Sequence, residues 1–239
     1  MTDGTLITVL GLGLTLGLRH ALDPDHIAAV STIVSESRSV KGSSLVGTFW
    51  GAGHTVALLL AGILVLALKF QISERLALWL EFGVAAMLVV LGSKSLFKSA
   101  RRWKVHVHRH THDGSSHVHL HLHPPGEQHT HGHRHLIGVG LRPFVIGLVH
   151  GMAGSATLMI LVLATIPSAI GGLIYIGIFG LGSIGGMLLM SSVISLPFIL
   201  TTRRFSAVSQ SLQLIVGLFS LSLGLFLVWQ YGFRERLLF

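Results

Sequence analysis

Six long runs of apolar residues constrain the fold of this chain more than any other feature. About 20 apolar residues are enough for a helix to cross the hydrocarbon core of a bilayer. Only 11% of the 239 residues are charged, whereas an average soluble domain has about 25%. The sequence therefore predicts an all-α integral membrane protein with six transmembrane helices. The runs lie near 5–34, 44–68, 76–97, 137–165, 169–199 and 207–231.

The first apolar run is interrupted by charged residues in the stretch RHALDPDHIAAV, residues 19–30. Each charge at the bilayer centre costs roughly 2.5–3.5 kcal/mol on insertion scales, so these aspartates need a function or a partner. Asp23 followed by Pro24 is typical of a helix start. The residue before a proline is also restricted away from helical angles. We therefore expect the first helix to be kinked or broken near Pro24.

The apolar runs also contain four of the sixteen histidines. Imidazole and carboxylate groups, in a chain without cysteine, suit nickel, cobalt, zinc or manganese. A single intramembrane histidine is usually explained by a hydrogen bond between helices, but four of them beside two aspartates favour a cation site. The candidate metal ligands are His20, Asp23, Asp25, His26, His54 and His150.

The spacing of these residues leaves two alternatives open. A straight helix turns about 100° per residue and cannot direct all four polar side chains of the stretch to one ion, whereas a break at Pro24 allows it. Asp23 can instead cap the second half-helix and pair with Arg19 four residues earlier. His20 can act as a direct ligand or as a partner of one.

The two halves of the chain resemble each other. Three spans per half is an odd number, so the second half must enter the membrane inverted, as in many secondary transporters with interrupted helices. We expect a first three-helix repeat at 1–97, a loop at 98–136 and a second repeat at 137–239. The alternative is a six-helix protein whose glycine-rich helices merely look alike. The aligned pairs are 17–30 with 147–160, 47–55 with 177–185, and 80–92 with 212–224.

Lysine and arginine are distributed unequally between the predicted loops. Ten lie in the loops after the first, third and fifth spans, against four in the other loops and the C-terminal tail. The positive-inside rule then places the first set in the cytoplasm and both termini outside. Basic residues confined to short loops indicate orientation and not nucleic-acid binding. The N-terminus has no basic region before its apolar run, so we expect no cleaved signal peptide.

The loop at 106–135 contains twelve histidines. This composition is typical of flexible, metal-binding segments. We interpret the loop as a cytoplasmic metal buffer, or as an arm that passes metal to a cytoplasmic acceptor. The alternative is a linker that binds metal adventitiously. Glu81, in the third span, either pairs with a neighbouring helix or guides cations at the outer face, and its repeat mate is Gln213.

The stretch RHALDPDHIAAV, with its H-x4-D-H pattern, resembles the motif of the nickel/cobalt transporter (NiCoT) family and the wider NicO-type permeases, including urease-associated homologues. GAGHT, at 51–55, resembles the second histidine motif of that family, and GLVHGMAGSATL resembles the second-half motif of its six-span members. The resemblance implies uptake of Ni²⁺ or Co²⁺ through His20, Asp25 and His26, with His54 assisting. The metal would be a transported substrate, with no resident cofactor. Asp-Pro-Asp-His is closer to uptake members than the Glu-Pro-Gly-His of efflux members.

We therefore expect a permease, not an enzyme, that takes up Ni²⁺ or Co²⁺ across the cytoplasmic membrane by alternating access. Efflux of the same metals is the main alternative. An intramembrane metalloenzyme is a minor one, because it needs an open metal position beside an acid or base, and the sequence has no HExxH-type pattern. The expected partners are the metal ion and the lipid bilayer. The chain differs from the eight-span members, because it lacks their leading helix and 169–199 contains no acidic residue. The sequence does not separate nickel from cobalt, because both metals suit nitrogen and oxygen ligands.

Overall fold

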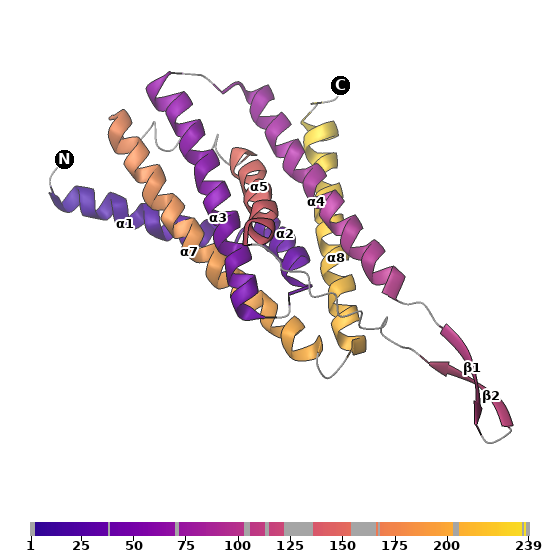
Figure 1. Ribbon diagram of the computed structural model, residues 1–239. Coiled ribbons are helices and arrows are strands. Elements are labelled where there is room, and N and C mark those ends of the chain that lie inside the picture. Colours follow the sequence, from indigo (N-terminus) through magenta and orange to yellow (C-terminus); the bar gives the residue numbers. More distant parts are fainter. Residues whose placement is uncertain are drawn as a thin grey trace.

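Helices form almost all of the protein (Figure 1). The computed structural model describes residues 3–37, 39–69, 72–102, 106–112, 115–121, 136–153, 166, 168–202, 206–235 and 237. The α-helices are α1 (Asp3–His20), α2 (Pro24–Val34), α3 (Val40–Gly62), α4 (Glu74–Arg102), α5 (Leu136–Ala153), α7 (Ala169–Thr202) and α8 (Ser206–Trp229). The π-helical turns η1 (Ile63–Ala67) and η2 (Gln230–Arg234) extend α3 and α8, and β1 (His106–His112) and β2 (Ser115–His121) form a hairpin.

Four of the helical stretches are long and apolar enough to cross a membrane within the described part of the chain. They are Val40–Leu66, Glu74–Arg101, Ala169–Thr201 and Ala207–Arg234, and they coincide with four of the six expected spans. The first expected span consists of the two shorter helices α1 and α2. The fourth begins with α5 and continues into 154–165, outside the described residues. The complete six-span arrangement therefore stays a prediction.

The chain leaves helical geometry between α1 and α2. The amides of Leu22 and Asp23 donate to the carbonyls of Arg19 and His20 at 2.8 and 3.1 Å, which closes the last turns of α1. Asp23 then has extended angles (φ −63°, ψ 144°) at the N-cap of α2, and Pro24 is the first helical residue. The side chain of Asp23 makes no cap hydrogen bond, so the alternative in which its carboxylate caps α2 is wrong.

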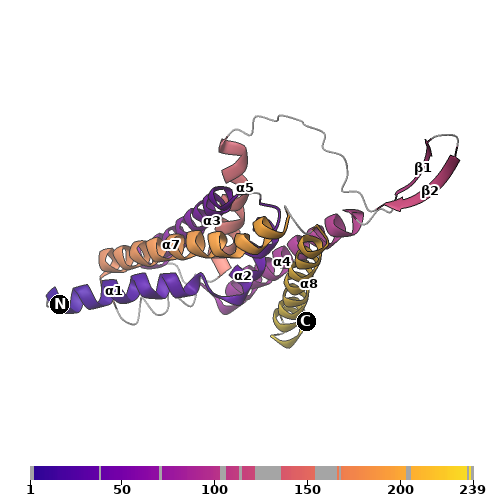
Figure 2. The ribbon, with the colours of Figure 1, turned by 90° about the horizontal axis from the view of Figure 1, so that it is seen from below.

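Helix α2 lies at the centre of the helical body (Figures 1 and 2). Helices α1, α7 and α3 run side by side, and α5 packs against α3, while α4 and α8 pair on the other side of α2. Most residues of α2 are buried, including His26, Ala28, Ala29, Val30 and Val34. A short helix that is buried nearly all round belongs to a core, so its N-terminal turn is held inside the molecule.

Glycines allow the helix backbones around α3 to approach closely. A Cβ atom on Gly53 would lie 2.0 Å from the carbonyl oxygen of Phe144, and one on Gly147 would lie 2.0 Å from that of Trp50. Both contacts join α3 to α5. Any larger residue would force these helices apart, as expected for packing based on small residues in membranes.

Residues 106–121 differ from the flexible loop that we expected. Strands β1 and β2 pair antiparallel, with histidine opposite histidine in three positions: His106↔His121, His108↔His119 and His110↔His117. The physical reason is the alternation of histidine with valine, threonine and leucine, which has the period of a strand. The intervening dipeptide Asp-Gly is also a strong hairpin signal. The remainder of the histidine-rich loop, 122–135, lies outside the described residues.

Candidate metal centre

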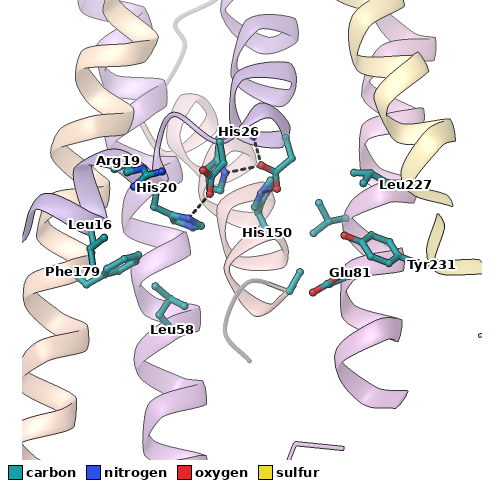
Figure 3. Close-up of a pocket in the computed structure, with 14 residues that line it drawn as sticks. Leu16, Arg19, His20, His26, Leu58, Glu81, His150, Phe179, Leu227 and Tyr231 are labelled. Carbon is teal, nitrogen blue, oxygen red and sulfur yellow. Dashed lines mark hydrogen bonds and ion pairs between the residues drawn. The ribbon is translucent and has the colours of Figure 1, made fainter. Parts of the chain in front are cut away.

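Four helices bring the histidines of the apolar runs together, and Figure 3 shows three of them, His20, His26 and His150. His20 is the last residue of α1, His26 lies in the first turn of α2, and His54 and His150 lie within α3 and α5. The ring centroids of His26 and His150 are 4.1 Å apart, those of His20 and His26 4.6 Å, and those of His20 and His54 5.1 Å. His20 is partly exposed and the other three rings are buried. Residues from both halves of the chain thus form one cluster.

Asp25 contacts two of these rings through different oxygens. Its Oδ1 lies 3.2 Å from Nδ1 of His26 and accepts a hydrogen bond from the His26 amide at 3.0 Å. Its Oδ2 lies 2.9 Å from Nε2 of His150. A carboxylate that bonds one ring nitrogen fixes the ring orientation and the tautomer, and leaves the other nitrogen free to bind a metal. Asp25 can therefore orient both rings.

Several buried ring nitrogens in the cluster have no hydrogen-bond partner. They are Nε2 of His26, Nδ1 of His150 and both nitrogens of His54. Buried polar atoms are nearly always hydrogen-bonded, because an unpaired buried group costs about 1–3 kcal/mol. Atoms of this kind are suitable donors for a metal ion, which would compensate for their lost hydration.

Two groups of potential ligand atoms meet the distance requirement for a single ion. His20, His26 and His54 form the first group, and Asp25, His26 and His150 form the second. Within each group the donor atoms lie within 4.8 Å of one another. His26 belongs to both groups, so it is the central residue of the candidate centre.

Asp23 lies at the edge of the cluster and belongs to neither group. Its Oδ2 lies 2.7 Å from Nδ1 of His20, and its side chain is 48% exposed. Within the described structure Asp23 pairs with His20 and not with Arg19, so the alternative of a pairing with Arg19 is wrong. The turn between α1 and α2 brings His20 and Asp23 together, with only two residues between them in sequence.

A cavity of about 590 Å³ extends from this cluster. Residues of α3, α4 and α8 line part of the cavity. They lie toward the ends of these helices near 68–74 and 231–235, and these ends are on the same side of the helical body (Figure 1). Three carboxylates and a single guanidinium line it, those of Asp23, Asp25, Glu81 and Arg19. With neutral histidines the lining is therefore negative, which favours a cation.

The sequence analysis missed three aromatic residues that contact or face the centre. Trp50 lies 6.3 Å from the ring of His26 and 5.8 Å from that of His150, and Phe179 lies 5.5 Å from that of His20. Tyr231 lines the cavity. Trp50 could have been found from sequence, because it precedes His54 by four residues and so shares its helix face. Phe179 and Tyr231 carried no such signal.

Comparison with known proteins identifies the family. A family model described as "NicO: High-affinity nickel-transport protein" matches residues 6–229. The chain belongs to the NicO family. A urease accessory protein, UreH, of Bacillus sp. (strain TB-90) is 37% identical over 237 residues, which cover 99% of this chain and 97% of that protein. As a NicO protein with four helices long enough to cross a bilayer, the chain is a multi-pass membrane protein, in a family of transport proteins and not of enzymes.

More distant relatives of this NicO protein match over shorter parts of their own length. A high-affinity nickel transport protein of Cupriavidus necator is 31% identical over 81 residues, which cover 34% of this chain and 22% of that protein. Chloroplast protein FOR GROWTH AND FERTILITY 1 of Arabidopsis thaliana is 25% identical over 224 residues, covering 93% of this chain and 59% of that protein. No solved structure matches the chain significantly.

Proposed function

We propose that this protein is a secondary transporter that takes up divalent transition-metal cations, Ni²⁺ and Co²⁺ first among them. One observation carries the proposal: the rings of His26, His54 and His150 lie 4.1–6.2 Å apart, and each has a buried nitrogen without a hydrogen-bond partner. Imidazole and carboxylate are ligands that bind nickel well. Membership in a family described by high-affinity nickel transport supports the choice of metal.

The ion is held at the convergence of α1, α2, α3 and α5. It sheds water as it passes from the cavity to His20 and His26, and the buried nitrogens of His54 and His150 replace the lost ligands. Asp25 supplies negative charge and orients two of the rings. The centre is therefore asymmetric, because both aspartates come from the first half of the chain.

We further propose that the chain consists of two inverted three-helix repeats. Reciprocal close contacts support this arrangement. Gly53 lies against the carbonyl of Phe144, and Gly182 lies in the same way against that of Leu14. The offset that aligns 47–55 with 177–185 carries Leu14 onto Phe144 and brings Gly53 within one position of Gly182.

The pair of α4 and α8 has the same reciprocity. Gly92 contacts the amide of Leu221, while Gly224 contacts that of Val89. The alignment of 80–92 with 212–224 pairs the two glycines with each other, and likewise Val89 with Leu221. A two-fold axis between the halves would produce such contacts, because it exchanges the two halves and repeats each contact with their roles reversed. Such an axis in the membrane plane is typical of transporters with a site near the midplane.

Among the described residues, the cavity extends from the candidate centre toward one side of the helical body. Leu58 and Glu81 line it on the side of residues 68–74, which the positive-inside rule assigns to the exterior. Toward the other side, Trp50 is fully buried and packs in an apolar core with Val30 and Met187. We infer an outward-facing state, from which rocking of the two halves would open the centre to the cytoplasm.

The membrane potential is a sufficient driving force for uptake in this scheme. A potential of about 100 mV contributes about 2.3 kcal/mol per elementary charge, or about 4.6 kcal/mol for a divalent cation that crosses fully. Each factor of ten in concentration corresponds to about 1.4 kcal/mol, so the potential supports accumulation by more than three factors of ten. Nucleotide hydrolysis is therefore not required.

The test is ⁶³Ni²⁺ uptake by cells that express His26→Ala at a level matched to the wild type. We expect uptake to fall to background, because His26 belongs to both ligand groups. Ser192→Ala is the control, since this hydroxyl bonds only the carbonyl of Leu188 in its own helix. Wild-type uptake by His26→Ala would refute the assignment of the centre.

The direction of transport is tested by metal sensitivity on overexpression. Uptake predicts that cells become more sensitive to Ni²⁺, whereas resistance would indicate efflux. In the proposed orientation the histidine-rich loop is cytoplasmic, both termini are outside, and the loop receives metal that has crossed the membrane.

A further inference from the structure

We propose that Glu81 and Tyr231 form an outer cation station, a second binding position in the cavity where a divalent cation rests before it reaches the histidine cluster. This inference rests on the proposed transport function, and it adds a site of oxygen ligands to the nitrogen-rich centre. The outer cation station consists of the Glu81 carboxylate on α4 and the Tyr231 side chain on η2.

Glu81 occupies an unusual position for a carboxylate. It lies seven residues after the start of the membrane-crossing stretch Glu74–Arg101, and its side chain is partly buried. Ionisable residues within transmembrane segments are rare, usually face the protein interior or a water-filled cavity, and mark ion pathways. Glu81 lines the same cavity as Asp25 and His26 (Figure 3), so an ion can pass between them without crossing a packed core.

No cationic side chain in the described part of the protein neutralises Glu81. The described ion pairs are His20–Asp23, His26–Asp25, His150–Asp25 and Lys98–Glu36. Arg19, the guanidinium of the cavity, lies on the opposite wall from Glu81 in Figure 3. Tyr231 lies beside Glu81 in the cavity lining (Figure 3), and its phenol hydroxyl does not compensate a negative charge. The carboxylate therefore remains available to a cation from solution.

The backbone around Tyr231 provides a second, independent observation. Helix α8 changes to a π-helical turn, η2, at Gln230–Arg234. Such turns are rare and are frequent at functional sites, because the wider turn re-aims the side chains that it carries. Here the turn carries Tyr231 to the cavity wall that it shares with Glu81 and Leu227 (Figure 3).

The corresponding position in the second half is neutral. Gln213, the repeat mate of Glu81, is buried and donates a hydrogen bond from Nε2 to the carbonyl of Ser35 at 3.2 Å. The charged member of the pair thus lies on the cavity side of the centre and the neutral member at the opposite end of α2. This difference favours transport in one direction. Glu81 attracts a cation on the cavity side of the centre, whereas the neutral Gln213 does not retain it on the opposite side.

The chemistry of the outer cation station differs from that of the histidine centre. A single carboxylate with a phenol hydroxyl holds a largely hydrated cation, chiefly by charge. Negatively lined clefts raise the local concentration of cations and their association rates in a salt-dependent way. Loss of the Glu81 charge should therefore raise the half-saturating metal concentration and leave the maximal rate nearly unchanged.

The experiment compares Glu81→Gln with Glu74→Gln, which removes an equal charge from the exposed first turn of the same helix. Initial rates of ⁶³Ni²⁺ uptake are measured against Ni²⁺ concentration at matched expression. We expect Glu81→Gln to raise the half-saturating concentration by about 3- to 10-fold, where tenfold corresponds to about 1.4 kcal/mol. Glu74→Gln and the charge-conserving Glu81→Asp should stay within about twofold of wild type.

Ionic strength separates an electrostatic role from a structural one. The Debye length falls from about 30 Å at 0.01 M to about 8 Å at 0.15 M, so the difference between wild type and Glu81→Gln should shrink as salt increases. An unchanged half-saturating concentration in Glu81→Gln would overturn the proposal. A loss confined to the maximal rate would also overturn it, because that result indicates a packing role.

Equilibrium dialysis of ⁶³Ni²⁺ against the purified full-length protein distinguishes failure of this inference from failure of the transport function. If the outer cation station exists, the wild type binds Ni²⁺ in a tighter and a weaker step. Glu81→Gln should lose the weaker step, and His26→Ala should lose the tighter step and keep the weaker one. A wild-type protein that binds Ni²⁺ in two steps but does not accumulate it would contradict the proposed transport while supporting the station. Identical binding by wild type and Glu81→Gln would eliminate the station, whatever the transport assays show.

Discussion

Asp25→Asn is the substitution that tests the candidate centre most sharply. The carboxylate faces Nδ1 of His26 with Oδ1, at 3.2 Å, and Nε2 of His150 with Oδ2, at 2.9 Å. When both ring nitrogens donate, Nε2 of His26 and Nδ1 of His150 keep their lone pairs, and these are two of the buried unpartnered atoms. An asparagine has one acceptor oxygen and can satisfy only one of the two rings.

The structure sets the expected magnitude. A hydrogen bond to a charged group contributes about 1.5–3 kcal/mol, and loss of a residue that orients a metal ligand typically weakens metal binding by about 10- to 100-fold. These two ranges agree, because a factor of ten in affinity corresponds to about 1.4 kcal/mol. We therefore expect Asp25→Asn to bind Ni²⁺ about 10- to 100-fold more weakly than the wild type.

The assay is equilibrium dialysis of ⁶³Ni²⁺ against the purified protein in lipid nanodiscs at neutral pH. Asp23→Asn is the comparison, because among the described residues the Asp23 carboxylate pairs with His20 alone, and its side chain is 48% exposed. Its effect should stay within about threefold. Binding by Asp25→Asn within twofold of wild type would refute the reasoning. Equal losses in both variants would also refute it, since they would indicate a general effect of negative charge.

Three further predictions concern the histidine-rich loop and the helix packing. Deletion of 106–135 should leave initial ⁶³Ni²⁺ uptake intact but change metal tolerance, and a well-folded deletion variant without uptake would contradict this. Metal binding by the loop should weaken below about pH 6, where imidazole becomes protonated; titration of the wild type against the deletion variant measures it. Gly53→Ala should lower thermal stability, because its Cβ would lie 2.0 Å from the Phe144 carbonyl and overpacking costs about 1–3 kcal/mol. Gly83→Ala, with no atom within 4 Å of its Cβ, should not.

Local patterns were sufficient for several features of this protein. Long apolar runs predicted the helices from 44–68, 76–97, 169–199 and 207–231, because a bilayer requires continuous apolar surface and internally satisfied backbone. The motif at 19–30 identified the family. In these cases the informative residues are neighbours in sequence, so local spacing carries the signal.

Two interpretations of local patterns were wrong. Asp23 occupies the N-cap position that Pro24 predicts, but its carboxylate contacts His20 and neither caps α2 nor pairs with Arg19. Residues 106–121 form a hairpin where composition indicated a flexible loop. Composition does not reveal this pairing, whereas the alternation of histidine with valine, threonine and leucine has the period of a strand.

The sequence by itself determined that the chain is a membrane protein with histidines and aspartates inside apolar runs, since the hydrophobic effect acts on local composition. Only the tertiary structure decided which of these residues meet. His150 reaches Asp25 across 125 positions, and it does so because glycines let α3 and α5 approach closely at Gly53 and Gly147. The cavity, and the place of Glu81 in it, likewise exist only once separate helices are packed, because no local pattern encodes the space between them.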